Sequence, residues 1–139
     1  MIDKFRFDNA LQIRSEWQRA IWGQILSEQL QNQELKHSFI TYKKGAHLFQ
    51  EASFPRGVYC INQGMVKIFK RGDEGKEQII HIAKSGEMVG FRSMFTEEPY
   101  KVGAEVLEES NICFIGKEDF LNLMDTNPVL RNGIIKELS

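Results

Sequence analysis

The sequence predicts a mainly β domain, a sandwich or barrel, with helices at both ends. Two observations carry this prediction. Short apolar runs recur at a spacing of mostly about 7–13 residues with glycine-containing turns between most of them, which is typical of all-β sandwiches and barrels. No stretch between the runs has the helical pattern that a parallel βαβ sheet needs. The runs are Phe39–Tyr42, His47–Phe49, Val58–Asn62, Met65–Lys70, Glu77–Ala83, Val102–Leu107 and Ile112–Ile115.

Length and composition set the class of protein. The chain has 139 residues, which favours one domain. Hydrophobic residues make up 42% and charged residues 27%, which excludes a disordered chain and a disulfide scaffold. The net charge is −1, from 18 Lys and Arg against 19 Asp and Glu. Domains that bind nucleic acid are usually basic, so this chain of 139 residues is expected to offer a poor DNA-binding surface.

The N-terminal segment, residues 1–37, is predicted to be helical. Trp17, Ile21 and Ile25 fall four residues apart and form part of one broad apolar face. The opposite face is rich in glutamine, unlike the Lys/Arg face of membrane-surface helices. We therefore expect this helix to pack against the domain or a partner.

The β region is predicted to span residues 38–116. Alternation places Val66 with Ile68 on one strand face, and Ile80 with Ile82 on another, opposite His81. The polar stretch between Arg71 and Lys76 predicts a hairpin turn.

The C-terminal segment, residues 117–139, is predicted to be two helices. The first spans Lys117–Met124, and Asn127 is the predicted N-cap of a second helix with Pro128 at its first position. An apolar stripe recurs every four residues along the second helix, and we expect it to form a dimer contact: Leu130, Ile134 and Leu138. The stripe reaches Leu138, the last residue but one, so we expect the native protein to continue past Ser139.

One segment interrupts the β pattern. Gly86 and Gly90 bound a turn, and Phe91–Phe95 could form one helical turn. The free N–H groups and positive dipole of such a turn attract anions, and Arg92 and Lys101 would add positive charge. A plain connector is the alternative interpretation.

No catalytic and no metal-binding residue is predicted. Cys60 and Cys113 lie in apolar runs and are interpreted as reduced, buried thiols. His81 is the best-placed haem ligand, although a lone strand histidine is more often a solvated or hydrogen-bonded side chain. The sequence has no His/Glu metal set and no Ser-His-Asp or Cys-His arrangement, which argues against a small β-barrel enzyme. Without a signal peptide or a membrane-spanning run, we expect a cytoplasmic protein.

The order of these glycines and apolar runs resembles the effector domain of the CRP/FNR superfamily of bacterial transcription regulators. The resemblance extends from about residue 38 to residue 139. The matching stretches are Tyr42–Gly45, Gly57–Ile68, Gly72–Ile82, Gly86–Gly90, Pro99–Val106 and Ile112–Ile115.

The resemblance implies a double-stranded β-helix, a jelly-roll or cupin-like β-roll of the cyclic-nucleotide-binding-domain type. It also implies a phosphate-binding cassette at Gly86–Ala104, a dimerisation helix that starts near Pro128, and a winged helix-turn-helix that this chain lacks. The ligand-binding residues it implies are Gly86, Glu87, Gly90, Phe91, Arg92, Ser93, Lys101 and Val102.

Three positions depart from the cyclic-nucleotide-binding pattern. Phe91 replaces the acidic residue that holds the ribose, and Lys101 and Val102 replace the Arg and Ser or Thr that bind the phosphate. Lysine lacks the bidentate fork of arginine, and valine has no hydroxyl. Each lost hydrogen bond to a charged group is worth about 1–3 kcal/mol, so the cAMP contacts are degraded. Three possibilities therefore stay open for this site: a cyclic nucleotide, another small anionic ligand, or no ligand.

The sequence thus predicts the effector-sensing domain of a CRP/FNR-type transcription regulator, without enzyme activity. We expect a homodimer that touches DNA only through a C-terminal domain missing from this chain and that has no membrane contact. The alternative is a stand-alone small-ligand-binding or protein-interaction module with no DNA contact.

Overall fold

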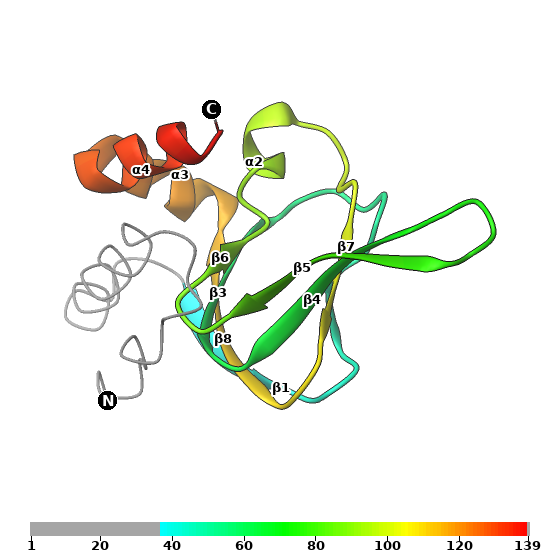
Figure 1. Ribbon diagram of the computed structural model, residues 1–139. Coiled ribbons are helices and arrows are strands. Elements are labelled where there is room, and N and C mark those ends of the chain that lie inside the picture. Colours follow the sequence, from blue (N-terminus) through cyan, green and yellow to red (C-terminus); the bar gives the residue numbers. More distant parts are fainter. Residues whose placement is uncertain (1–36, 139) are drawn as a thin grey trace.

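Two antiparallel β-sheets face each other and helices cover one end in the computed structural model, which describes residues 37–138 (Figure 1). The first sheet has the strand order β1 (His37–Tyr42), β8 (Ser110–Gly116), β3 (Gly57–Gln63) and β6 (Met88–Val89). The second has the order β2 (His47–Phe49), β7 (Gly103–Val106), β4 (Met65–Arg71) and β5 (Glu77–Lys84). The predicted helical segment 1–37 lies, apart from His37, outside the described residues.

Each predicted apolar run overlaps one of these strands, and the mainly β roll is confirmed. The predicted hairpin joins β4 to β5, and the N–H of Gly72 donates to the carbonyl of Lys76 across its turn at 2.7 Å. The tip of this hairpin projects beyond the rest of the roll (Figure 1). The short strand β6 was missed, because two residues are too few to show alternation.

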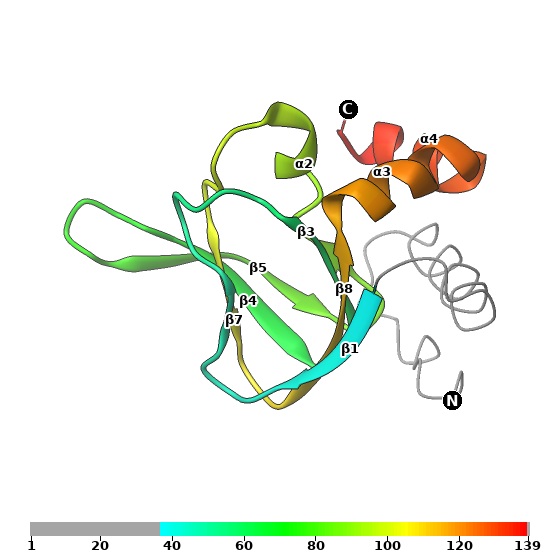
Figure 2. The ribbon, with the colours of Figure 1, turned by 180° about the vertical axis from the view of Figure 1, so that it is seen from behind.

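Three helices belong to the described residues: α2 (Ser93–Thr96), α3 (Lys117–Thr126) and α4 (Pro128–Leu138). The predicted cap of α4 is confirmed, because the N–H of Leu130 donates to Oδ1 of Asn127 at 3.0 Å. Helix α3 continues directly from β8 and packs on β3 and β8, at the end of the roll seen in Figure 2. Helix α4 then packs against α3.

The central strands of the first sheet, β3 and β8, are largely buried on both faces. One core cluster lies between the sheets and contains Leu48, Phe49, Ile61, Val66, Ala83, Val89, Tyr100, Ala104, Val106 and Ile112. The second cluster, called the helix-side cluster below, contains Val58, Cys60, Met88, Phe91, Met94, Cys113, Ile115, Phe120, Leu123, Leu130 and Ile134. Along β3, Cys60 therefore faces the helices and Ile61 faces the second sheet. A strand buried on both faces needs a continuous apolar run, which is what the sequence of β3 offers.

Two residues of the stripe predicted to form a dimer contact on α4 are buried within this chain. Leu130 and Ile134 are fully buried inside this chain, at 0% exposure each. Both belong to the helix-side cluster, together with buried side chains of β3, β8 and α3. The exposed apolar side chains of α4 are instead Val129 and Ile135. The side chain of Leu138 lies outside the described side chains.

The predicted alternation in β5 fails at Ile80. In the pairing with β4, His81 lies opposite Ile68 and Ile79 lies opposite Phe69, so the register shifts and Ile80 is left between them. Such a β-bulge turns neighbouring side chains toward one side of the strand. Ile80 and His81 consequently line the same cavity, although the sequence pattern placed them on opposite faces.

Candidate ligand-binding site

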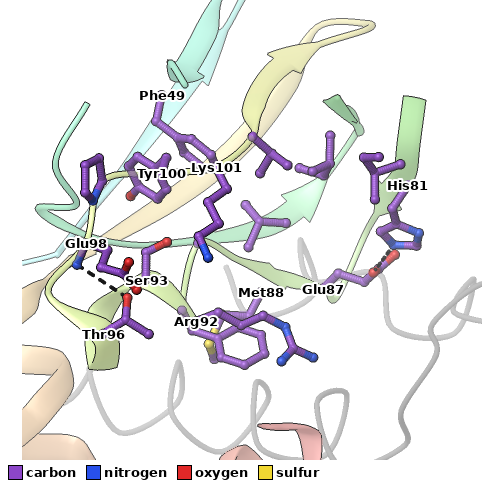
Figure 3. Close-up of a pocket in the computed structure, with 17 residues that line it drawn as sticks. Phe49, His81, Glu87, Met88, Arg92, Ser93, Thr96, Glu98, Tyr100 and Lys101 are labelled. Carbon is purple, nitrogen blue, oxygen red and sulfur yellow. Dashed lines mark hydrogen bonds and ion pairs between the residues drawn. The ribbon is translucent and has the colours of Figure 1, made fainter. Parts of the chain in front are cut away.

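A cavity of about 430 Å³ opens beside the segment that interrupts the β pattern (Figure 3). Its walls come from β5, from the chain between β6 and α2, from residues 98–102, and from single side chains of β2 and β4. Most of the predicted site residues line it: Glu87, Gly90, Phe91, Arg92, Ser93, Lys101 and Val102. Gly86 does not line the cavity.

Gly86 anchors the cavity wall to the first sheet. Its N–H donates to the carbonyl of Ile61 at 2.7 Å, and the carbonyl of Glu87 accepts from the N–H of Ile61 at 2.9 Å. Gly86 and Gly90 have φ values of +90° and +87°. Residues with a Cβ rarely adopt this left-handed backbone, so the two glycines let the chain turn into and out of β6.

Two basic side chains reach the cavity. The Lys101 side chain is exposed and points toward the segment that carries Ser93 and Arg92 (Figure 3). The Arg92 guanidinium lies 5.7 Å from the centre of the Phe91 ring, within range of a cation–π contact. Glu87 and Glu98 also line the cavity, so its two cations are matched by two carboxylates.

Glu87 and His81 form a hydrogen-bonded pair in the cavity wall. Oε1 of Glu87 lies 2.8 Å from Nε2 of His81, and Oε2 accepts from the N–H of Lys84 at 2.9 Å. The Glu87 residue is only 5% exposed, so these two hydrogen bonds offset the cost of burying its charge. His81 is thus a hydrogen-bonded side chain, one of the two interpretations open from the sequence. Within residues 37–138, no group of three or more His, Cys, Asp or Glu side chains could hold a metal ion.

The remaining walls are apolar. The rings of Phe49 and Tyr100 stack with centres 3.8 Å apart and planes 13° apart. Burial, with a smaller effect of Tyr59, raises the pKa of Tyr100 to about 12, so its phenol is neutral at physiological pH. Phe91 is 7% exposed and belongs to both the cavity wall and the helix-side cluster.

Several lining residues were not predicted. Three of them, Glu98, Pro99 and Tyr100, lie inside the predicted cassette. Their position next to Lys101 in the sequence could have indicated that they line the site. Phe49 and Ile68 come from strands far away in the sequence, and no local pattern marks them. They reach the cavity only because β2 and β4 both pair with β7.

The geometry defines a class: a two-sheet β-roll with a ligand-sized cavity framed by a glycine-bounded segment. The model of the cyclic nucleotide-binding domain family matches residues 39–127 of this chain. The chain therefore belongs to the cyclic nucleotide-binding domain family and is related to the CRP/FNR regulators, as the sequence resemblance predicted.

The relatives differ in the share of their own length that this chain matches. An uncharacterised protein of Haemophilus influenzae is 29% identical over 99 residues, which are 71% of this chain and 77% of that protein. The transcriptional activator protein Anr of Pseudomonas protegens is 34% identical over 97 residues, which are 70% of this chain and 39% of that protein. The match thus spans about two fifths of the length of Anr.

Some solved protein structures have the same fold as this chain. The sensor domain of the transcriptional regulator DNR from Pseudomonas aeruginosa superposes with a TM-score of 0.71 at 24% identity, over 89% of each chain. At this identity the likeness is one of fold. Among the described residues, no helix is long and apolar enough to cross a membrane.

Proposed function

We propose that this chain is the effector-sensing domain of a CRP/FNR-type bacterial transcription regulator, and that its cavity binds a small anionic ligand. The observation that carries the proposal is the meeting of Lys101, Arg92 and the Glu87–Ser93 segment in one cavity. A pocket of this kind, mostly apolar with a few polar groups, is typical of a small-molecule site. The chain itself would have no enzyme activity and would work in the cytoplasm.

Cyclic AMP fits this cavity poorly. Phe91 offers no hydrogen-bond acceptor for a ribose, and Val102 has no hydroxyl for a phosphate. Glu87 is a carboxylate in the cavity wall, but each of its oxygens already accepts a hydrogen bond from the protein. We therefore expect a ligand that is anchored mainly by Lys101 and needs no diol contact.

Ligand binding would reach the helices through the shared cluster. Phe91 and Met94 belong to the helix-side cluster together with Leu130 and Ile134 of α4. The ring of Phe95 in α2 also lies 6.2 Å from the ring of Phe120 in α3, centre to centre. A ligand that binds one packing arrangement of this cluster better than another would shift the position of α4 by a change of population.

The complete regulator would be a homodimer. The exposed side chains Val129 and Ile135 of α4 take the place of the buried Leu130 and Ile134 as candidates for the dimer contact. DNA would be bound by a further domain, since these residues carry a net charge of only −1. Light scattering at several concentrations tests the dimer, and a monomer throughout would contradict it for this chain.

Direct binding measurements test the sensor role. The purified 139-residue protein would first be examined by native mass spectrometry for a retained ligand, and then titrated calorimetrically with cAMP, cGMP and a panel of small carboxylates. We expect micromolar or tighter binding of a small anion and weaker binding of cAMP. An empty protein that binds no anion in the panel would contradict the proposal.

A second candidate function is a stand-alone binding module without DNA contact. The relative from Haemophilus influenzae favours it, because the match covers 77% of that protein and leaves little room for another domain. The reading frame of the native gene separates the two candidates. A helix-turn-helix encoded after residue 139 supports the regulator, and a stop codon supports the module.

A further inference from the structure

The hydroxyl of Tyr100 is a polar group in the cavity wall that lacks a partner in the protein. Tyr100 lines the cavity and is only 4% exposed. Its backbone N–H donates to the carbonyl of Ser53, and its carbonyl accepts from the N–H of Ala52. Within residues 37–138, its hydroxyl makes no hydrogen bond. Buried tyrosine hydroxyls are usually hydrogen-bonded, so this one has a donor to spare for a ligand.

Gly90 shows where the hydroxyl lies. A Cβ atom added at Gly90 would lie 3.5 Å from the hydroxyl oxygen of Tyr100, and Gly90 also lines the cavity. Among the described side chains, the fully enclosed polar atom without a partner is Oδ1 of Asn62. The oxygen of Tyr100, which has no partner either, therefore keeps contact with open space. The stack on Phe49, visible in Figure 3, holds the ring in place.

The hydroxyl is available as a donor rather than as an acceptor. It stays protonated at physiological pH, because burial raises the pKa of Tyr100 to about 12. Conjugation with the ring makes a phenol oxygen a poor acceptor, so its favourable partner is an acceptor atom. Lys101, the next residue, lines the same cavity and makes no ion pair within the described part of the chain. The two neighbouring residues thus offer only donors, and the ligand has to supply the acceptors.

We propose that Tyr100 is a specificity-determining residue, whose hydroxyl donates a hydrogen bond to a second, uncharged oxygen of the small anion that Lys101 holds. The inference rests on the proposed function, because it takes the cavity as an anion site, and it adds the class of ligand. An oxo carboxylate with an apolar body is the simplest member of this class, since Ile68, Met88 and Val89 supply apolar walls. An anion without the second oxygen would leave the Tyr100 donor unpaired, which is the costly arrangement.

Two matched pairs of monocarboxylates test this proposal by calorimetry on the 139-residue protein. Phenylpyruvate is compared with 3-phenylpropionate, and 4-oxo-4-phenylbutanoate with 4-phenylbutanoate, so that the oxo group stands at two different distances from the charge. At least one oxo acid should bind about tenfold more tightly than its partner. Tyr100→Phe keeps the ring and should reduce this ratio to about one. Tyr42→Phe, a change outside the cavity, should leave the ratio unchanged.

A stability measurement separates this role from a structural one. Because the Tyr100 hydroxyl has no partner in the protein, Tyr100→Phe should leave the urea midpoint of the ligand-free protein unchanged. Ser110→Ala is the comparison, because the Ser110 hydroxyl donates to the carbonyl of Glu108 at 2.7 Å and accepts from the N–H of Met65 at 3.1 Å. Its midpoint should fall. An equal fall in Tyr100→Phe would overturn the proposal, since the hydroxyl would then be held by the protein.

The outcomes of the binding experiment separate this inference from the proposed function. Equal binding within both pairs, or a preference for the oxo acids that survives Tyr100→Phe, overturns the role of Tyr100 and leaves the anion site intact. A different small anion that binds through Lys101 with the same Kd in the unmodified protein and in Tyr100→Phe has the same consequence. If no anion binds, the proposed function and this inference both fail.

Discussion

Phe91, in the wall of the cavity, and Ile134, on α4, belong to one buried hydrophobic cluster. By the resemblance, Phe91 stands where cyclic-nucleotide-binding members have an acidic residue. A carboxylate at this position would be buried among apolar side chains, where an unpaired charge is costly. Phe91 is thus a packing contact between the cavity wall and the helix-side cluster.

Substitution of Ile134 tests whether α4 is part of this chain's own core. Ile134→Ala should lower the free energy of unfolding by about 2–5 kcal/mol, because it leaves a cavity in a fully buried cluster. The neighbouring change Ile135→Ala, at an exposed site, should cost about 0.5 kcal/mol or less. Urea denaturation of the two variants measures the difference. Equal losses would mean that α4 does not pack on the roll as described.

The cap of α4 makes a smaller, separate contribution. Asn127→Ala removes the acceptor for the N–H of Leu130 and should lower the free energy of unfolding by about 1 kcal/mol. Asn132→Ala, at an exposed position within the same helix, is the matched control and should be neutral or slightly stabilising. Urea midpoints of the two variants that fall together would contradict the cap.

The roll could be predicted from the sequence because most of its strands are long enough to show a pattern. The runs Val58–Asn62 and Met65–Lys70 lie within β3 and β4, which are seven residues long each. β6 has only two residues and is held by its pairing with β3, which is set by contacts far apart in the chain. The bulge at Ile80 is likewise a property of the β4–β5 pairing and leaves no trace in the sequence of β5.

The cavity was predicted only where it is made of one continuous segment. The resemblance implied a ligand-binding cassette at Gly86–Ala104, and most residues of this segment line the cavity. The hydrogen bond between His81 and Glu87 depends on the distance between their side chains, which residue types cannot show. The sequence showed that Leu130 and Ile134 lie on an apolar stripe, but periodicity cannot distinguish burial in the chain's own core from a contact with a second copy.

The buried thiols predict a loss of stability at alkaline pH. Burial raises the pKa of the Cys113 thiol to about 12. Burial also raises the pKa of the Cys60 thiol well above its ordinary value, and the charge of Cys113 raises it further. A thiol whose pKa is raised in the folded state stabilises the fold fully below its unfolded pKa, near 9, and this contribution is lost as the pH rises toward 12. The Tm should therefore fall between pH 9 and pH 12.

Cys113→Ala provides the control for this pH dependence. The variant should be less stable at pH 7 but should lose less of its Tm between pH 9 and pH 12, because one titrating thiol is gone. Differential scanning calorimetry across this range measures both slopes. Identical slopes would show that the thiol of Cys113 does not titrate with a raised pKa.

The thermal shift caused by a small anion, measured with and without the Lys101 ammonium, tests the central claim most directly. An anion at 100 times its Kd stabilises a protein by about 2.7 kcal/mol, which raises the Tm by several degrees. The account predicts this rise in the unmodified protein and in Lys70→Ala, whose exposed lysine lies outside the cavity, and its loss in Lys101→Ala. An equal rise in all three proteins would contradict the assignment of the cavity as the anion site.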